Sequence, residues 1–169
     1  MRLLVLSDTH LGALSVHRMP PEVWTMADEA DAILHAGDVC EAAVLAALRQ
    51  RAPVHAVLGN NDVALRRQLP EDLQVELDGV RIAMVHDAGP TSGRAARMAR
   101  RFPAADVVVF GHSHAPVVEA PDGGPLLVNP GSPTQRRRQP VHTVAWLEVA
   151  DGSVGVAKIV EVGPLAAAT

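Results

Sequence analysis

Short apolar runs that end abruptly at polar residues or glycine constrain the fold of this 169-residue chain more than any other feature. Three of these runs occupy residues 3–6, 32–35 and 54–58. The segments between them, 21–30 and 44–48, carry apolar residues at helical spacing. Short apolar runs of this kind form buried strands, and the segments between them form amphipathic helices. The first half therefore predicts a β-α-β-α-β order, which requires a parallel sheet.

The second half of the sequence favours hairpins. Asp78–Gly79 and Asp151–Gly152 are pairs that tolerate positive φ, and each separates two strand-like segments. A helix is expected to begin with Ser92 as its N-cap and to direct Met98 and Phe102 toward the core. The strands expected here are 75–77, 80–85, 107–110, 126–128, 144–149 and 154–160, the last three as antiparallel pieces. We expect two mixed sheets packed face to face, with helices outside.

Composition limits the functional classes. The length suits one compact domain, which we place at residues 1–163, with a short tail at 164–169. A formal net charge of −4 and 2% aromatic residues argue against a protein that coats nucleic acid, because they offer neither a basic surface nor a stacking platform. The single cysteine, Cys40, excludes an internal disulfide, and the opening apolar run is too short to span a membrane. We expect a soluble, cytoplasmic protein without a membrane partner.

Seven residues with metal-binding side chains follow the predicted strands. They are two carboxylates, one amide and four imidazoles: Asp8, His10, Asp38, Asn60, His86, His112 and His114. Because ligands of open α/β sheets bind beyond the carboxyl ends of strands, these side chains are expected to converge. A divalent ion takes about four to six ligands, so seven indicate two ions roughly 3.5 to 4 Å apart with one bridging carboxylate. Asp38 is the expected bridge.

The charges of such a centre favour phosphate chemistry. Two divalent cations bring four positive charges, of which Asp8, Asp38 and a bridging hydroxide neutralise three. The imidazoles and the Asn60 amide neutralise none. The remaining positive charge would attract a phosphate oxyanion.

The order of these motifs resembles the calcineurin-like metallophosphoesterases, and among them the small single-domain phosphodiesterases of the YfcE type. Five blocks, each after a predicted strand, carry the resemblance: Asp8-Thr9-His10, Gly37-Asp38, Gly59-Asn60-Asn61-Asp62, His86 and Gly111-His112-Ser113-His114. The segment 129–133, Asn-Pro-Gly-Ser-Pro, also looks like a family feature. The resemblance implies an α/β (α+β) fold, a four-layer αββα sandwich of two mixed β-sheets with flanking helices.

The resemblance also implies the ligand sets and the reaction. The first metal would be held by Asp8, His10 and His114. The second would be held by Asn60, His86 and His112, and Asp38 would bridge the two. Hydrolysis of a phosphate ester would proceed by in-line attack of a metal-bridging hydroxide. The residues given catalytic roles are Asp38, Asn60, Asn61 and Asp62.

The cofactors expected on this basis are two divalent metal ions per chain. Oxygen and imidazole donors without sulfur favour Mn²⁺ and also allow Fe, Zn or Ni. The expected partner is a small phosphate ester, with a phosphodiester preferred. Nucleic acid is disfavoured as a partner, and a homo-oligomer is compatible with the sequence.

Two positions depart from the family pattern. Many relatives carry a histidine after the metal-binding Asn, where it is thought to protonate the leaving group in a dyad with the next acid. This chain has Asn61 at that position, beside Asp62. His86 is followed by Asp87, which either supports a histidine or is a turn residue. Substrate contacts are expected from Asn61 and from Arg136.

Other interpretations compete with a dinuclear phosphoesterase. Taken singly, an Asp or His at a strand end is equally well explained as a turn or capping residue, and His35 is expected to be structural. Cys40 is expected to be a buried thiol rather than a nucleophile. The arginine run at 136–138 is typical of a solvated face but would also suit a metal-dependent nuclease. The alternative from another class is a non-catalytic Vps29-like scaffold or binding module with a degenerate metal site. The presence of all seven ligand positions argues against it.

Overall fold

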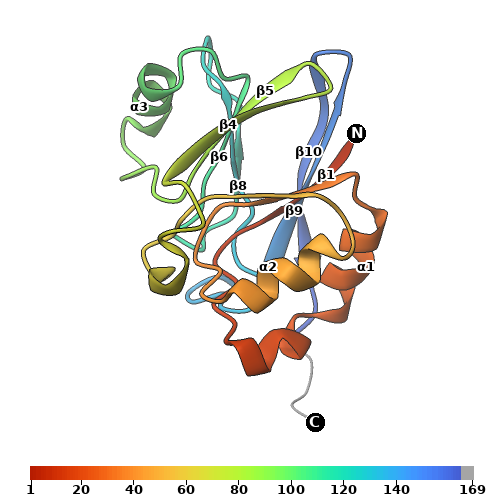
Figure 1. Ribbon diagram of the computed structural model, residues 1–169. Helices are drawn as coiled ribbons and strands as arrows, with labels where there is room; N and C mark the ends of the chain where they lie inside the picture. The colour runs from red at the N-terminus through yellow and green to blue at the C-terminus, as the bar shows by residue number, and fades with distance from the viewer. Residues whose placement is uncertain (165–169) are drawn as a thin grey trace.

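Residues 1–164 are described by the structure, a computed structural model, and strands from both ends of the chain form its first sheet (Figure 1). Its strand order is β10-β9-β1-β2-β3. The strands are β1 (Arg2–Leu6), β2 (Ala32–His35), β3 (Val54–Ala56), β9 (His142–Ala150) and β10 (Ser153–Val162). β1, β2 and β3 are parallel and are connected by α1 (Pro21–Glu29) and α2 (Ala42–Arg49). The predicted β-α-β-α-β order is confirmed.

The middle of the chain forms the second sheet, in the order β4-β5-β6-β8-β7. Its strands are β4 (Asp72–Leu77), β5 (Val80–Val85), β6 (Val107–Val109), β7 (Val117–Glu119) and β8 (Leu126–Asn129). β5, β6 and β8 are parallel, and α3 (Arg94–Arg101) connects β5 to β6. The expectation that β8 is an antiparallel piece holds only for its pairing with β7. Sequence analysis missed β7 because it is short and ends in two exposed residues.

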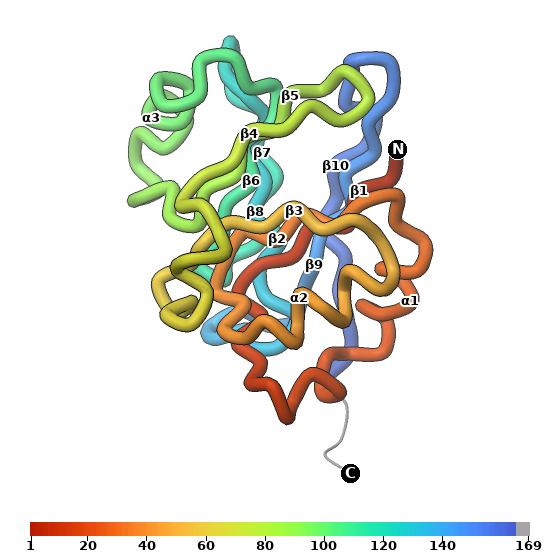
Figure 2. The backbone as a smooth tube through the Cα atoms, viewed as in Figure 1, coloured from red at the N-terminus to blue at the C-terminus, as the bar shows by residue number. Residues whose placement is uncertain are grey.

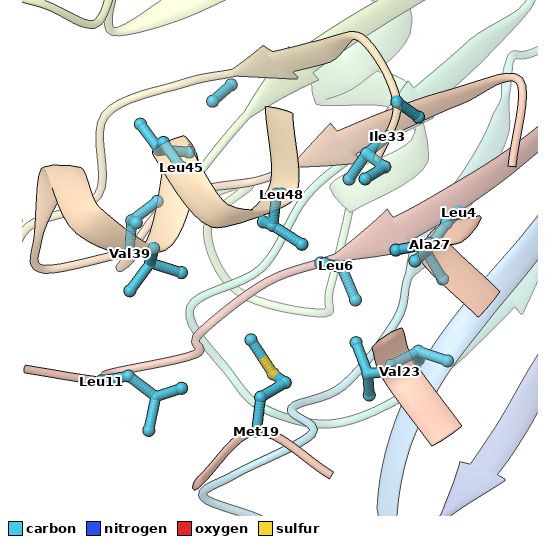
Figure 3. Packing of buried hydrophobic residues seen from close by; sticks show 14 of the residues in the cluster. Leu4, Leu6, Leu11, Met19, Val23, Ala27, Ile33, Val39, Leu45 and Leu48 are labelled. Carbon is cyan, nitrogen blue, oxygen red and sulfur yellow. The ribbon is translucent and has the colours of Figure 1, made fainter. Parts of the chain in front are cut away.

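The two sheets pack face to face, and helices cover their outer faces (Figure 1). Side chains alternate along β1: Leu3 and Val5 pack between the sheets, whereas Leu4 and Leu6 pack against α1 and α2. Figure 3 shows the helix-side cluster from close by. On the second sheet, α3 contributes Met98 to a separate cluster. The expected αββα sandwich of two mixed sheets is therefore confirmed.

Both expected hairpin turns are present. Asp78 and Gly79 join β4 to β5 with φ of 50° and 78°, and Asp151 and Gly152 join β9 to β10 with φ of 50° and 75°. The Gly152 amide also donates a hydrogen bond of 2.9 Å to the Asp78 carbonyl oxygen. This bond ties the two sheets together at the end of the sandwich opposite the carboxyl ends of β1 and β5.

The start of α3 differs from the prediction. Gly93, in left-handed backbone with φ of 69°, is the N-cap in place of Ser92. Glycine adopts this conformation at the least cost, and a helix can begin there without a side-chain cap. The Arg97 guanidinium instead holds the preceding loop, because it donates to the carbonyl oxygens of Ala88, Pro90 and Ser92.

The last strand, β10, ends next to residue 163, where we placed the limit of the domain. Of the expected tail at 164–169, residues 165–169 lie outside the described residues.

No helix within residues 1–164 is both long enough and apolar enough to cross a membrane. Two 3₁₀ helices, η1 (Ala13–Arg18) and η2 (Val63–Leu65), lie in the loops after β1 and β3.

Truncation of a side chain between the sheets should destabilise the fold. Leu34 in β2 is fully buried between the sheets, whereas Leu14 in η1 is 93% exposed. We predict that Leu34→Ala lowers the free energy of unfolding by about 2–5 kcal/mol, because it removes buried methyl groups and leaves a cavity. The matched substitution Leu14→Ala should change it by less than about 0.5 kcal/mol. Urea unfolding measures both, and equal losses would contradict this packing.

Candidate metal centre

The carboxyl ends of strands from both sheets meet at one end of the sandwich. The segments after β1 and β2 lie there beside the loops that follow β6 and β8 (Figure 2). Backbone hydrogen bonds join these segments: Asp8 N–H donates to the Gly37 carbonyl oxygen and Gly111 N–H to the His86 carbonyl oxygen, both at 2.9 Å. The His112 N–H donates to Asp8 Oδ2 at 3.0 Å and so connects the two sheets. This end of the sandwich brings together all seven candidate ligands.

Three of the seven side chains form a first cluster on the side of η1. His114 Nε2 lies 3.2 Å from Asp8 Oδ1 and 3.2 Å from His10 Nε2. Asp8 Oδ1 is buried and has no hydrogen-bond partner within residues 1–164. One ligand atom from each side chain lies within 4.8 Å of the others. Three donors converge on a space that one cation could occupy.

A second cluster lies on the side of β5. Asn60 Oδ1 lies 3.1 Å from His86 Nε2 and 3.0 Å from His112 Nδ1. His86 is buried, whereas Asn60 and His112 are exposed. All three side chains line a cavity of about 360 Å³, together with Glu71 and Asp87. This cluster therefore opens to solvent more widely than the first.

Asp38 lies between the two clusters. Its Oδ2 atom is 3.6 Å from His10 Nε2 and 3.4 Å from His86 Nε2. The side chain is only 1% exposed. Asp8, Asp38 and His86 also offer ligand atoms within 4.8 Å of one another. One carboxylate oxygen thus faces donors from both clusters.

Left-handed backbone, uncommon outside glycine, occurs at five of the seven candidate ligands. Their φ angles lie between 44° and 67°: Asp8, His10, Asp38, His112 and His114. Such conformations persist where the surrounding structure holds them, and they cluster at functional sites. Gly37, with φ of 89°, belongs to the same pattern, because a Cβ atom there would lie 2.7 Å from His86 Nδ1. The backbone is strained where it presents the ligands.

Backbone carbonyls orient two of the candidate imidazoles. His86 Nδ1 donates to the Ala36 carbonyl oxygen at 2.7 Å, and His114 Nδ1 donates to the Gln135 carbonyl oxygen. Since a carbonyl oxygen can only accept, each Nδ1 carries a proton and each Nε2 faces its cluster. Metal-binding histidines commonly use their second nitrogen in this way.

The Asn-Pro-Gly-Ser-Pro segment at 129–133 hydrogen-bonds to the loops that carry the first cluster. The Ser132 hydroxyl donates to the Asp8 carbonyl oxygen at 2.7 Å. Asn129 Nδ2 donates to the Gly111 carbonyl oxygen at 2.9 Å. The sequence indicated this segment only through its resemblance to the calcineurin-like metallophosphoesterases. Its polar side chains tie together the loops that carry Asp8 and the histidines after β6.

Asn61 and Asp62 do not form an acid dyad. Asn61 donates to both oxygens of the Asp38 carboxylate, through its backbone N–H at 2.8 Å and through Nδ2 at 2.7 Å. The fully buried Asp62 carboxylate accepts the backbone N–H groups of Asp38, Cys40 and Gly59 at 2.9, 2.6 and 2.7 Å. Asp62 therefore holds the loops after β2 and β3 together, and its carboxylate is directed into the backbone.

The buried carboxylates of Asp8 and Asp38 make the site negative. Burial opposes ionisation of Asp8, but the His114 imidazole and the Ser7 hydroxyl outweigh burial and lower the pKa of Asp8. The pKa of Asp38 is likewise lowered in spite of burial, by His86 and by the donors described above. Burial lowers the pKa of His86, but its hydrogen bonds to Asp38 and Ala36 and the two nearby carboxylate charges together raise it more, and the net shift is upward. The local field therefore favours a positive charge among these groups.

The donor set fits divalent metal ions. His10 Nε2, His114 Nε2 and Asp8 Oδ1 lie within 3.8 Å of one another. Within the described part of the chain, histidines are the only ion-pair partners of Asp8 and Asp38. A cation between these groups would remove their mutual repulsion, and imidazole and oxygen donors suit a first-row divalent metal. Asp8 Oδ1, which has no hydrogen-bond partner within residues 1–164, is available as a ligand.

Three further sequence candidates have local roles. Asp87 accepts the Gly89 N–H at 2.7 Å, as a turn residue does. His35 lies 3.2 Å from the Thr9 hydroxyl, and burial lowers the pKa of His35 to about 4. Burial and the nearby carboxylates raise the pKa of Cys40 to about 11, so the thiol stays protonated at neutral pH. These findings agree with a structural His35 and a non-nucleophilic Cys40, although the thiol expected to be buried is only partly buried.

Arg136, the expected substrate contact, hydrogen-bonds within its own loop. Its Nη1 atom donates to the Gln139 carbonyl oxygen at 2.7 Å. Arg137 instead donates from Nη1 to the His112 carbonyl oxygen at 3.3 Å. Of these two arginines, Arg137 is the one that the structure joins to a candidate ligand.

Sequence analysis missed residues that orient the ligands. Ser7 donates to Asp8 Oδ2 at 2.6 Å, and Gln135 accepts from His114 through its carbonyl oxygen. A polar residue at the end of a buried run, directly before the ligand, was an available signal for Ser7. Gln135 acts through its backbone, so no pattern of side chains could have identified it.

The chain is similar to known metallophosphoesterases. The calcineurin-like phosphoesterase superfamily domain matches residues 1–152. A probable metallophosphoesterase of Methanocaldococcus jannaschii is 33% identical over 150 residues, which cover 87% of this chain and 75% of that protein.

Two solved structures share the fold. Vps29 of Entamoeba histolytica, complexed with Zn²⁺, has a TM-score of 0.71 at 24% identity and covers 95% of this chain and 99% of its own. An archaeal phosphodiesterase has a TM-score of 0.70 at 22% identity and covers 95% of this chain and 100% of its own. These likenesses concern the fold alone. The family match over most of the chain, with the relative at 33% identity, shows that this protein belongs to the calcineurin-like phosphoesterase superfamily.

Proposed function

We propose that this protein is a phosphodiesterase that works with two divalent metal ions, for which Mn²⁺ is the preferred choice. The observation that supports the proposal most is the position of Asp38, whose Oδ2 atom faces His10 of one cluster and His86 of the other. The orphaned Asp8 Oδ1 and the strained backbone at the ligands add to it. Two buried carboxylates held at this cost are most simply explained by a bound cation.

The ligand sets follow the two clusters. In the proposal, Asp8, His10 and His114 hold the first ion. Asn60, His86 and His112 hold the second, and Asp38 is shared by both. When bound, the ions would supply Lewis acidity and a hydroxide nucleophile for in-line attack on phosphorus.

The remaining side chains position these groups. Two hydrogen bonds from Asn61 keep the Asp38 carboxylate oriented and ionised. Asp62 holds the loop that presents Asp38, through the Asp38 N–H. An Asn amide can donate a hydrogen bond but cannot release a proton at neutral pH, so Asn61 cannot protonate a departing alkoxide.

Cavities on both sides of the centre support a diester rather than a monoester. One, of about 360 Å³, lies beside Asn60 and His112. Another, of about 220 Å³, lies beside His10 and includes Arg18. A phosphodiester carries an organic group on each side of phosphorus, so both cavities would be used.

Metal removal separates the enzyme from the Vps29-like scaffold. We expect elemental analysis to find two ions per chain, and hydrolysis of bis(p-nitrophenyl) phosphate to be lost on chelation and restored by Mn²⁺. Zn²⁺ is bound by the Vps29 structure described above, so metal binding alone does not distinguish the two. Bound metal without hydrolysis of any mono- or diester, cyclic nucleotides included, would favour the scaffold.

Asp38 and Asp62 provide a matched pair of buried carboxylates. We predict that Asp38→Asn removes at least one metal and lowers turnover by about 10²-fold or more, because a neutral amide bridges two cations poorly. Asp62→Asn should keep both metals. It should lower the free energy of unfolding by about 1–3 kcal/mol, since an amide NH₂ would then face backbone donors. Equal loss of metal in the two variants, measured by elemental analysis, would show that the ligand assignment is wrong.

The absence of an imidazole at position 61 predicts a strong dependence on the leaving group. General acid catalysis is typically worth roughly 10²- to 10⁴-fold in rate, and its lack matters most for alkoxides and least for phenolates. We expect the rate to fall steeply across a series of aryl and alkyl phosphodiesters as the leaving-group pKa rises. A flat dependence, with the chemical step shown to limit the rate, would mean that another residue supplies the proton.

A further inference from the structure

Arg137 has an unusual backbone conformation beside the metal centre. Its φ is 50°, and its two arginine neighbours at 136 and 138 are not among the residues with positive φ. A side chain that is neither Gly, Asn nor Asp rarely takes this conformation, and it persists only where neighbouring contacts hold it. The contacts of Arg137 should therefore explain why its backbone takes this conformation.

The loop before Arg137 is held firmly against the ligands. Ser132 Oγ accepts the Gln135 N–H at 2.9 Å while it donates to the Asp8 carbonyl oxygen. The Gln135 carbonyl oxygen accepts from His114 Nδ1. Two residues later, the left-handed turn at Arg137 directs its side chain back across the histidines that follow β6. The Nη1 atom then reaches the His112 carbonyl oxygen at 3.3 Å.

The loop that carries Arg137 contacts both clusters of the centre. The hydrogen bond of Arg137 goes to His112, which belongs to the second cluster. Two residues earlier, the Gln135 carbonyl oxygen accepts from His114 of the first cluster. Arg137 is exposed, so the remaining N–H groups of the guanidinium are free to meet a ligand that enters from solvent.

We propose that Arg137 binds the non-bridging oxygens of the substrate phosphate, an inference that rests on the proposed function. A guanidinium has five N–H donors in a fixed fork that matches phosphate in two parallel hydrogen bonds. One donor holds the side chain at His112, through a bond slightly longer than the usual range of about 2.7–3.2 Å. The others belong to a side chain exposed to solvent, from which a phosphate would enter. The substrate contact expected at Arg136 belongs to Arg137, because Arg136 is bonded to Gln139.

The neighbouring arginines provide matched controls. In metal-loaded protein, Arg137→Gln should raise the KM for bis(p-nitrophenyl) phosphate and the inhibition constant for inorganic phosphate by about tenfold, the usual effect of one lost charge-assisted bond. Arg137→Lys should recover part of this loss, because it keeps the charge without the fork. Arg136→Gln and Arg138→Gln should change both constants by less than about twofold. Each variant is checked for metal content and melting temperature.

Direct binding of inorganic phosphate, followed by calorimetry on the same metal-loaded proteins, separates this proposal from the proposed function. If the unmodified protein binds phosphate but hydrolyses no ester, the proposed function fails and the role of Arg137 is still measured. The role is overturned if Arg137→Gln binds phosphate as tightly as the unmodified protein, or if all three Gln variants weaken binding equally. Loss of metal in Arg137→Gln would also overturn it, since Arg137 would then position His112. The proposed role of Arg137 is also overturned if the unmodified, metal-loaded protein binds no phosphate.

Discussion

Burial of two carboxylates at one end of the sandwich is the constraint on which the site depends. Asp8 and Asp38 are at most 1% exposed, and their ion-pair partners within residues 1–164 are histidines rather than Lys or Arg. An unpaired buried charge costs several kcal/mol, and a hydrogen-bond acceptor left alone adds to it. Asp62 avoids this cost by accepting three backbone N–H groups. Asp8 Oδ1 accepts no hydrogen bond within residues 1–164, and its surroundings suit a metal ion as its partner.

The fold positions the site because two sheets end at the same place. Each parallel strand delivers one loop, and interlocking hydrogen bonds such as those of Ser132 and Asn129 hold those loops at fixed distances. The far end of the sandwich is tied separately, at Asp78 and Gly152. Two cavities, beside Asn60 and beside His10, border the ligands that these loops hold.

Most of the fold could be predicted from apolar periodicity. The runs before Asp8 and Asp38 are strands because both faces of the first sheet are buried, and the pairs Asp78–Gly79 and Asp151–Gly152 turn as expected. Ser92 was wrong as the N-cap, because the chain required left-handed backbone one residue later. The short strand β7 carried too little pattern to be recognised.

The candidate ligands could be found from position alone, because each follows a strand. The roles of their neighbours could not. Asp62 resembles a catalytic acid in sequence, but its oxygens are occupied by backbone donors, which only the fold of the loops decides. Arg137 cannot be told from Arg136 in an arginine run, because the difference lies in one backbone angle. Carbonyl partners such as that of Gln135 leave no trace in the sequence.

Anomalous diffraction from crystals grown with Mn²⁺ would show whether the centre holds two ions, because it locates each ion without reference to activity. We predict two peaks roughly 3.5 to 4 Å apart. One should be bound by Asp8, His10 and His114, the other by Asn60, His86 and His112, with Asp38 touching both. A single peak, or two peaks that leave Asp38 uncoordinated, would contradict the account.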